Sequence, residues 1–355
     1  MKMIKNHKRV IVLAVLVLVA ELVVFQCTDL GKGKFVFLGN NIDYSVSDIE
    51  DLGIVVGPDV YLIIIDEYPS TQTLDTYYNY DNSEFVNSLQ TLGFYTPETS
   101  YTSYPETDMV LNCMLNMVSN PLNLEGVAGS SMPSSIYRDT LVNDVFQSYG
   151  YTTINLGSAW GGTIENPYAD VSLVASRNPC NDWESVFPFQ MESVKSIPDL
   201  EGSTFTFMHT IGAHRPWIFS ADGTVREYID CPEYMLDQVS YVSDCILDAM
   251  ETILERSDSP PVILLMSDHG PFLPGFSTYS DLEITGRLNN FMAVYLPDGN
   301  YNEWPYGQIN FFRYIFNTYL GTDYSYLPVE HYYVIDWESS PLVLEEVSEK
   351  LGIKY

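Results

Sequence analysis

Residues 59–67 read Asp-Val-Tyr-Leu-Ile-Ile-Ile-Asp-Glu, and this stretch decides the fold. Within it, residues 60–65 form an unbroken apolar run, which predicts a parallel β-strand that is buried on both faces of its sheet. Asp66 then lies at the carboxyl end of the strand. In open α/β sheets the binding crevice lies beyond these ends, which makes Asp66 a candidate functional residue. A strand-end aspartate is as common in helix caps and turns, so Asp66 alone does not decide between the two roles.

Apolar runs of strand length recur along the chain, with helical patterns between them. Strands are expected over residues 152–156, 205–209, 262–266 and 291–296. The clearest helical pattern covers residues 234–256, where apolar residues recur every three to four positions, and weaker patterns cover 82–92, 135–149 and 308–319. This βα alternation predicts a single α/β domain over residues 58–355, with a central, mostly parallel sheet flanked by helices.

Polar side chains follow these strands at the edge where a binding crevice forms. His209 ends the run 205–209 and leads to His214, and Ser267-Asp-His-Gly270 follows the run 262–266. With Asp66, these residues place carboxylates and imidazoles at one edge of the sheet, and such groups are the ligands that a divalent metal ion needs. The alternative for residues 267–270 is a plain turn.

The charge of the chain limits its partners. Asp and Glu number 47 against 16 Lys and Arg, which gives a net charge of -31, and a hydrophobic content of 46% is enough for a folded core. Such a charge disfavours binding to nucleic acid or to anionic membrane surfaces. An anionic substrate would need local positive charge, which a bound divalent cation supplies. The chain contains no G-x-S-x-G elbow, which argues against a serine hydrolase of the α/β type.

The N-terminus predicts export. Residues 1–9 form a basic flank, residues 10–26 a signal anchor or signal peptide that Glu21 interrupts, and residues 27–57 a tether. The basic flank predicts a cytoplasmic N-terminus. The domain is then expected outside the cell membrane on a single N-terminal pass, or secreted if the segment is cleaved. Outside the cytoplasm, a bridge between Cys180 and Cys231 is compatible with their Pro-flanked loops.

Short motifs follow one another in a fixed order. They are residues 59–67, the helical stretch 82–94 ending in Leu-Gly-Phe, Tyr104-Pro-Glu-Thr-Asp108, Ala213-His-Arg-Pro-Trp217 and Ser267-Asp-His-Gly270. In this order and spacing they resemble the sulfatase-like enzymes of the alkaline phosphatase superfamily, especially lipoteichoic acid synthases and phosphoethanolamine transferases. The resemblance covers most of residues 58–320. It implies an alkaline-phosphatase-like sandwich, with residues 58–355 as a sulfatase-like catalytic domain.

By this resemblance, Thr107 is the nucleophile. Asp66, Asp268 and His269 would hold one divalent metal ion, Mn, Zn, Mg or Ca, that also contacts the Thr107 oxygen. Coordination would lower the pKa of a hydroxyl that is otherwise a poor nucleophile. A helix beginning near Thr107 would add backbone N–H groups directed at the anion. The alternative interpretation is that Thr107 is only the N-cap of a helix over residues 108–117.

The resemblance also implies substrate contacts. His214 would contact the phosphate or protonate the leaving group. Trp160 lies where related synthases place an aromatic substrate contact, although the stretch Trp160-Gly-Gly162 could also be a loop with an aromatic plug. His209 is either a second substrate contact or a strand-end histidine bonded to backbone.

Departures from the family pattern limit the kind of ester and the number of metal ions that are expected. The C/S-x-P-x-R motif of arylsulfatases does not occur in the sequence, so phosphate esters are expected rather than sulfate esters. His209, His214 and His331 do not complete a second metal set, so one ion is expected. The resemblance thus implies a metal-dependent hydrolase or phosphotransferase at the outer cell surface, acting on an anionic ester such as a lipid head group or a cell-surface glycan. The alternative is a catalytically inactive surface-binding domain with the same fold, which the many tyrosines would suit as contact surface.

Overall fold

Strand β2 lies inside a seven-stranded sheet with the order β1-β4-β3-β5-β2-β6-β7. The computed structural model describes residues 34–37, 57–119, 138–176, 182–273, 280–336 and 343–352. The strands of this sheet are β1 (Lys34–Phe37), β2 (Val60–Ile65), β3 (Thr152–Leu156), β4 (Val171–Val174), β5 (Thr204–Thr210), β6 (Val262–Met266) and β7 (Met292–Tyr295). Neighbouring strands are parallel except for β6 with β7. The predicted α/β class with a mostly parallel central sheet is confirmed.

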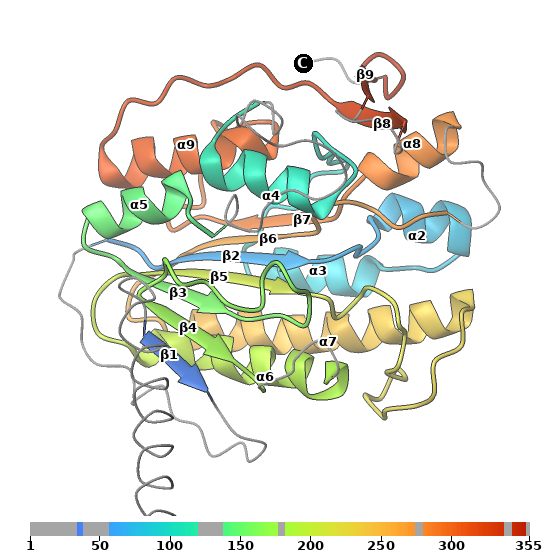
Figure 1. Cartoon of the computed structure of the whole chain (residues 1–355), viewed down its shortest axis with the longest axis horizontal. Helices are drawn as coiled ribbons and strands as arrows, with labels where there is room; N and C mark the ends of the chain where they lie inside the picture. The colour runs from blue at the N-terminus through green and yellow to red at the C-terminus, as the bar shows by residue number, and fades with distance from the viewer. Residues whose placement is uncertain are drawn as a thin grey trace, which may run out of the picture.

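Helices cover both faces of the sheet (Figure 1). They are α2 (Thr71–Tyr78), α3 (Ser83–Thr91), α4 (Thr107–Asn116), α5 (Leu141–Ser148), α6 (Trp183–Ser196), α7 (Pro232–Arg256), α8 (Asp281–Leu288) and α9 (Phe311–Ile315). A 3-10 turn follows α6 at Ile197–Asp199, another precedes α9 at Gln308–Asn310, and a π-helical turn follows α9 at Phe316–Leu320. A separate antiparallel hairpin joins β8 (Tyr332–Asp336) and β9 (Val343–Glu346).

Strand β2 is buried on both faces because its residues alternate between two cores. Its odd-numbered residues pack with α3, α6 and α7, and its even-numbered residues pack with α4, α5 and α9. Figure 1 shows these two groups of helices on opposite sides of the sheet. Each fully buried aliphatic side chain of this kind contributes about 1.5–3 kcal/mol of burial free energy. The apolar run 60–65 therefore fixes the centre of the fold.

The sequence patterns predict part of this architecture correctly. The strands predicted over residues 60–65, 152–156 and 262–266 have the predicted bounds. Helix α7 begins before the predicted residue 234, at Pro232, because proline is favoured in the first turn of a helix. The pattern 308–319 forms a 3-10 turn, a short α-helix and a π-turn in succession. The patterns did not predict β4, α2, α6 or α8.

Part of the N-terminal prediction lies outside the described residues. This part is the basic flank 1–9 and the apolar segment 10–26. Cys180 of the predicted bridge with Cys231 also lies outside the described residues. Within the predicted tether 27–57, residues Lys34–Phe37 form the edge strand β1, which pairs in parallel with β4. Over the ranges that the structure describes, no helix is long and apolar enough to cross a bilayer.

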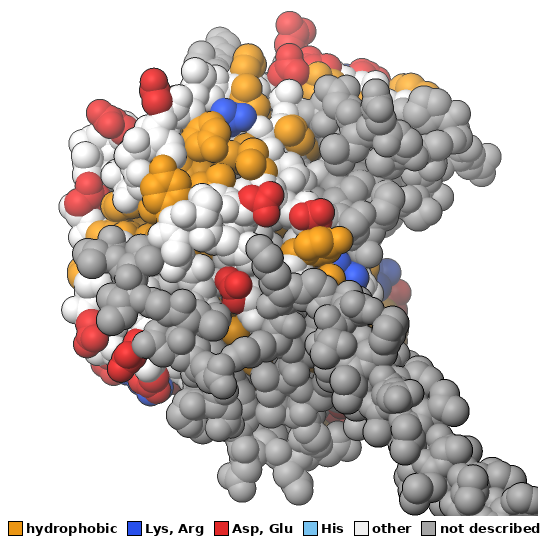
Figure 2. Space-filling view, turned by 60° about the vertical axis from the view of Figure 1, so that its left-hand side comes forward, with side chains coloured by type: hydrophobic (Ala, Val, Ile, Leu, Met, Phe, Trp, Pro, Cys, Tyr) orange, Lys and Arg blue, Asp and Glu red, His pale blue; other side chains and the backbone are white. Residues whose placement is uncertain are grey.

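The described surface is acidic in agreement with the composition. Figure 2 shows Asp and Glu side chains spread over one face, where Lys and Arg side chains are few. An anionic ligand approaching this face meets repulsion unless its binding site supplies positive charge.

Candidate metal centre and active site

The register of three neighbouring strands brings the predicted metal ligands together. Strand β2 lies between β5 and β6, and Ile64 of β2 is level with His209 of β5 and with Met266 of β6. Asp66 follows Ile64 by two positions, and Asp268 follows Met266 by the same number. Because these strands are parallel, both carboxylates lie at the carboxyl edge of the sheet, as the sequence predicts.

Asp66, Asp268 and His269 form a group of side chains suited to a metal ion. Each offers one ligand atom, and these atoms lie within 4.8 Å of one another. The carboxylates are almost completely buried, with exposed fractions of 5% for Asp66 and 0% for Asp268. Asp66 Oδ1 and Asp268 Oδ2 have no hydrogen-bond partner. A buried carboxylate oxygen in this state is destabilising unless a cation or a donor satisfies it, so these residues fit a divalent cation.

The imidazole of His269 presents one nitrogen to this group. Its Nδ1 lies 3.1 Å from the carbonyl oxygen of Gly270, and its Nε2 lies 3.3 Å from Asp268 Oδ2. An Nδ1–H that donates to the carbonyl leaves a lone pair on Nε2, which is the form in which histidine binds a metal. Burial and the positive charge of Arg287 hold the pKa of His269 well below its usual value, which keeps the ring neutral.

Two carboxylates so close together in a buried site resist ionising at the same time. Burial, followed by the negative charge of Asp66, raises the pKa of Asp268 to about 7. Burial also acts to raise the pKa of Asp66, but the hydrogen bond and charge of His209, with the other histidines nearby, outweigh it and lower that pKa. A bound cation would relieve the repulsion between the two carboxylates.

His209 is fully buried beside Asp66. Its Nε2 lies 3.5 Å from Asp66 Oδ2, and its Nδ1 lies 2.8 Å from the hydroxyl oxygen of Thr163. His209 is not among the described residues that line the cavity at this site. The sequence left open a substrate contact or a bond to backbone, whereas the structure pairs the ring with two side chains, one of them a candidate metal ligand.

Thr107 is the first residue of helix α4. Glu106 precedes it with an extended backbone, so Glu106 is the N-cap and the alternative interpretation of Thr107 as the N-cap is wrong. Thr107 Oγ1 lies 3.2 Å from His269 Nε2, and the same hydroxyl, through a hydrogen bond to Asp268, acts to lower the pKa of that carboxylate. The N–H groups of a first helical turn have no helical partners and favour an anion.

A cavity of about 280 Å³ opens at this group. His214 lines it with a side chain that is 33% exposed, and its Nε2 lies 3.5 Å from Glu67 Oε2. Trp160 also lines the cavity and stands edge-on to His209, with 5.7 Å between the ring centroids. The predicted site residues that line the cavity are Asp66, Thr107, Trp160, His214 and His269.

Arg287 forms a buried ion-pair network at this cavity that the sequence did not reveal. Its Nη1 pairs with Glu67 and its Nη2 lies 3.2 Å from Glu106 Oε1, while Nη1 also donates to the carbonyl oxygen of Gly270 at 2.8 Å. The guanidinium lies over the ring of Phe272, 4.0 Å from its centroid. Arg287 comes from α8, and 220 positions separate it from Glu67, so no local pattern could have indicated the pairing.

The described lining of the cavity is strongly acidic. Carboxylates come from Asp66, Glu67, Glu106 and Asp108, whereas Arg287 is the only Lys or Arg among the described lining residues. Two of the carboxylates already pair with this arginine. An anionic ester would therefore be repelled here unless a cation were bound.

Solved structures with similar architecture identify the fold. The C-terminal periplasmic domain of EcEptC from Escherichia coli aligns with a TM-score of 0.56 at 12% identity, over 82% of this chain and 96% of that one. A structure of that domain in complex with Zn aligns with a TM-score of 0.52 at 11% identity, over 80% of this chain and 91% of that one. No protein-family model matches the sequence, and a search of curated proteins gives no match.

Two further structures widen the comparison. The lipoteichoic acid synthase LtaP from Listeria monocytogenes aligns with a TM-score of 0.53 at 10% identity, over 84% of each chain. A protein in the alkaline phosphatase superfamily from Vibrio parahaemolyticus aligns with a TM-score of 0.51 at 11% identity, over 83% of this chain and 78% of that one. The chain therefore has the sulfatase-like fold of the alkaline phosphatase superfamily, as its motifs predict.

Proposed function

We propose that the protein is a metal-dependent phosphotransferase or hydrolase that attacks phosphate esters with the hydroxyl of Thr107. One observation carries the proposal: Thr107 Oγ1 lies 3.2 Å from His269 Nε2, beside two buried carboxylates that have unsatisfied oxygens. A divalent ion held by Asp66, Asp268 and His269 would lower the pKa of the Thr107 hydroxyl and neutralise charge on the phosphoryl oxygens. The Zn complex of the EcEptC domain supports a divalent ion of this kind.

The residues of the chain would carry out the transfer in two steps. Thr107 Oγ1 would lose its proton to solvent and form a bond to phosphorus while the ester P–O bond breaks, and His214 would donate a proton to the departing oxygen. The product is a phosphothreonine. A second acceptor, water in a hydrolase or an alcohol in a transferase, would then cleave this phosphothreonine and restore Thr107. The positive N-terminal end of the α4 helix dipole would favour the phosphoryl oxygens in both steps.

We place the substrate at the outer cell surface, as a lipid head group or a glycan that bears a phosphate ester. The predicted anchor over residues 10–26 supports this location, as does the periplasmic setting of the EcEptC domain. The lipoteichoic acid synthase among the similar structures supports a surface polymer or lipid as the acceptor. A cavity of about 280 Å³ has room for a phosphorylated head group, with the rest of the substrate outside.

The test uses the full chain with chromogenic phosphate monoesters, phosphate diesters and sulfate esters, in Mn, Zn, Mg, Ca or EDTA. Turnover should require a metal ion and should fall at least about 100-fold in Thr107→Ala, with partial recovery in Thr107→Ser, which keeps the hydroxyl. Mass spectrometry of a stopped reaction should find phosphate on Thr107 alone.

A catalytically inactive surface-binding domain predicts the opposite results. In that case the chain binds metal, turns over no ester in any of the tested ions, and never carries phosphate on Thr107. Unchanged turnover in Thr107→Ala would contradict Thr107 as the nucleophile. The protein would still be an enzyme in that case.

A further inference from the structure

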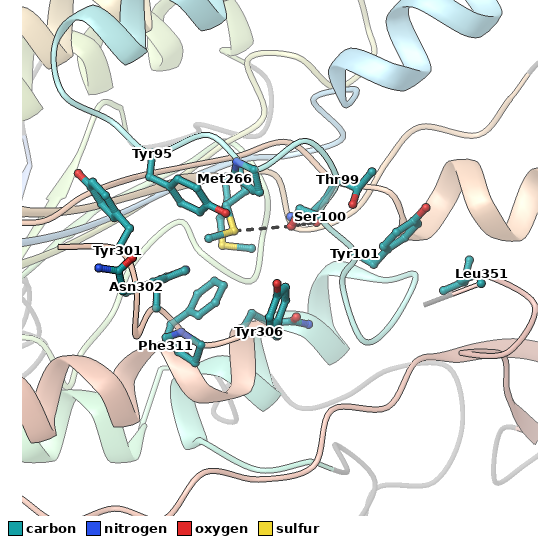
Figure 3. Close-up of a pocket in the computed structure, with 18 residues that line it drawn as sticks. Tyr95, Thr99, Ser100, Tyr101, Met266, Tyr301, Asn302, Tyr306, Phe311 and Leu351 are labelled. Atoms are coloured by element: carbon teal, nitrogen blue, oxygen red, sulfur yellow. Dashed lines mark hydrogen bonds between the residues drawn. The ribbon is translucent and has the colours of Figure 1, made fainter. Parts of the chain in front are cut away.

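A second cavity, of about 550 Å³, lies apart from the candidate active site and shares none of its described lining residues. It is enclosed by the segment 95–101, by the ends of β6 and β7, and by residues 301–311 that lead into α9. Its aromatic lining residues are Tyr95, Tyr101, Tyr301, Trp304, Tyr306 and Phe311. Figure 3 shows Tyr95 beside Tyr301 on one side of this aromatic cavity and Tyr101 on the other, with Tyr306 between them.

We propose that the aromatic cavity binds an uncharged saccharide. This inference goes beyond the ester chemistry and does not rest on it. The volume falls within the range of about 300–1,000 Å³ that is usual for small-molecule sites.

The charge of the lining excludes an ionic ligand. None of the described residues that line the cavity is Asp, Glu, Lys, Arg or His, although 18% of the chain is charged. A phosphate, carboxylate or ammonium group buried here would lose its hydration without gaining a counter-charge, which is strongly unfavourable. The lining thus differs in kind from that of the ester site, where carboxylates and Arg287 predominate.

The polar groups of the lining exclude a plain hydrocarbon ligand. Hydroxyl and amide side chains stand among the rings, including Ser100, Asn302 and Gln308. A sugar ring combines an apolar C–H face with hydroxyl groups at its rim. Tyrosine and tryptophan match this combination, because each has a flat apolar body and a polar handle. Ser100, Asn302 and Gln308 already donate to Asn290, Asn300 and Thr102, and their oxygens remain available to accept from a sugar hydroxyl. An acyl chain would also leave the buried Nε1 of Trp304 without an acceptor.

Four of the aromatic side chains in the walls are held in place before any ligand arrives. The rings of Tyr95 and Tyr301 stack with 5.3 Å between centroids, and the Tyr301 hydroxyl donates to the carbonyl oxygen of Gly93 at 2.7 Å. Trp304 packs on Phe311 at 4.8 Å, and its Nε1 is a buried donor without a hydrogen-bond partner. Walls held in this way lose little side-chain entropy on binding, which favours affinity.

The position of the cavity relates it to the ester site. Met266 ends β6 and lines the aromatic cavity, and Asp268 and His269 follow it along the chain after Ser267. A saccharide bound here would therefore occupy the same edge of the sheet as the ester, on the side of the antiparallel strand β7.

The experiment titrates the full chain with maltotriose, cellotriose and triacetylchitotriose by calorimetry, following Trp fluorescence in parallel. At least one of these neutral trisaccharides should bind with a Kd of about 1 mM or below. Tyr306→Ala and Asn302→Ala should each weaken binding about tenfold, since each removes one ring or one amide from the wall. Both side chains are exposed, so these variants should fold normally. The matched control is Tyr168→Ala, an exposed tyrosine outside the cavity that should leave binding unchanged.

Three results in these titrations would overturn the proposal, and a fourth comes from Thr107→Ala. They are no binding of any neutral trisaccharide at about 10 mM, equal affinity in wild type and both cavity variants, or a preference for glucose 6-phosphate over the neutral sugars. Thr107→Ala should bind the saccharide as wild type does. Loss of binding in that variant would place the sugar in the ester site and also contradict a separate saccharide site.

Discussion

Thr107 Oγ1 and His269 Nε2 lie 3.2 Å apart, although 162 positions separate the two residues in the sequence. This contact brings the start of helix α4 next to the turn that follows strand β6. The proposed nucleophile and a candidate metal ligand are already in contact there. We therefore expect the metal-loaded and metal-free proteins to differ mainly in electrostatics.

Asp268→Asn should abolish stabilisation by metal. Wild type should gain about 2.7 kcal/mol in free energy of unfolding when Zn is raised to 100 times its Kd, because the ion binds only the folded state. The variant lacks one carboxylate ligand and should gain almost nothing. Thermal unfolding with Zn and with EDTA measures both. A full metal-dependent gain in the variant would remove Asp268 from the ligand set.

In EDTA, the stability of wild type relative to Asp268→Asn should fall as pH rises from about 4 to 7. Burial and Asp66 raise the pKa of Asp268 to about 7 in the folded protein, so over this window Asp268 holds more protons in the folded state than in the unfolded state. The lowered pKa of His269 acts in the opposite direction in both proteins, so the comparison removes it. Urea unfolding of both proteins at several pH values gives the difference. The same pH dependence in both would assign the titration to another group.

Arg287→Ala should be strongly destabilising. It leaves Glu67 buried and Glu106 partly buried without their partner, and breaking a buried pair such as that of Glu67 costs about 3–5 kcal/mol. The matched control is Arg256→Ala, which removes a surface pair with Asp199 and should cost about 1 kcal/mol or less. Urea denaturation of the two variants gives the comparison. Equal losses of unfolding free energy in the two variants would mean that burial does not strengthen the ion pairs of Arg287.

Gly270→Ala should displace the candidate metal centre. A Cβ at this position would lie 2.0 Å from the backbone carbonyl oxygen of Gly286, and backbone cannot move aside cheaply. We expect a loss of about 1–3 kcal/mol in unfolding free energy, with weaker Zn affinity. Gly161→Ala is the control, since its Cβ would meet nothing within 4 Å. Calorimetric Zn titration checks both, and normal affinity in Gly270→Ala would contradict the close packing.

His214→Gln should lower kcat by about 10²–10⁴ for esters with poor leaving groups, because it removes the proposed proton donor. The kcat for nitrophenyl esters should fall less, since their leaving group departs without a proton. Zn stoichiometry should stay the same, because His214 is not one of the three candidate ligands. Equal losses for both kinds of ester would mean that His214 binds the substrate rather than protonating it.

The sequence predicts the elements whose signal is local. The runs 60–65, 152–156 and 262–266 are apolar or β-branched apart from Asn155, because both faces of these strands are covered, and their bounds agree with the structure. The direction of a strand leaves no such trace, so the antiparallel course of β7 could not be read from its composition. Helix α6 contains Pro188, which weakens any helical pattern, and only packing against α7 and the sheet explains it.

In the candidate site too, residues with a local sequence signal could be predicted, and residues placed only by the tertiary fold could not. Asp66, Asp268 and His269 could be predicted because each directly follows a strand with a strong pattern. Arg287 could not, because it lies on a short helix with a weak pattern and finds its partners through the tertiary fold. The aromatic cavity is likewise assembled from segments as distant as Tyr95 and Phe311.

The candidate metal ligands follow the sheet strands directly, while the other site residues come from elsewhere. Asp66 and Asp268 extend β2 and β6, and the supporting His209 belongs to β5. Thr107 begins a helix, and Trp160 and His214 lie in loops. Loops accept insertions and exchanges that a central sheet does not tolerate. Descendants of this protein could therefore acquire new substrates by altering loops alone, and would inherit the metal-binding chemistry intact.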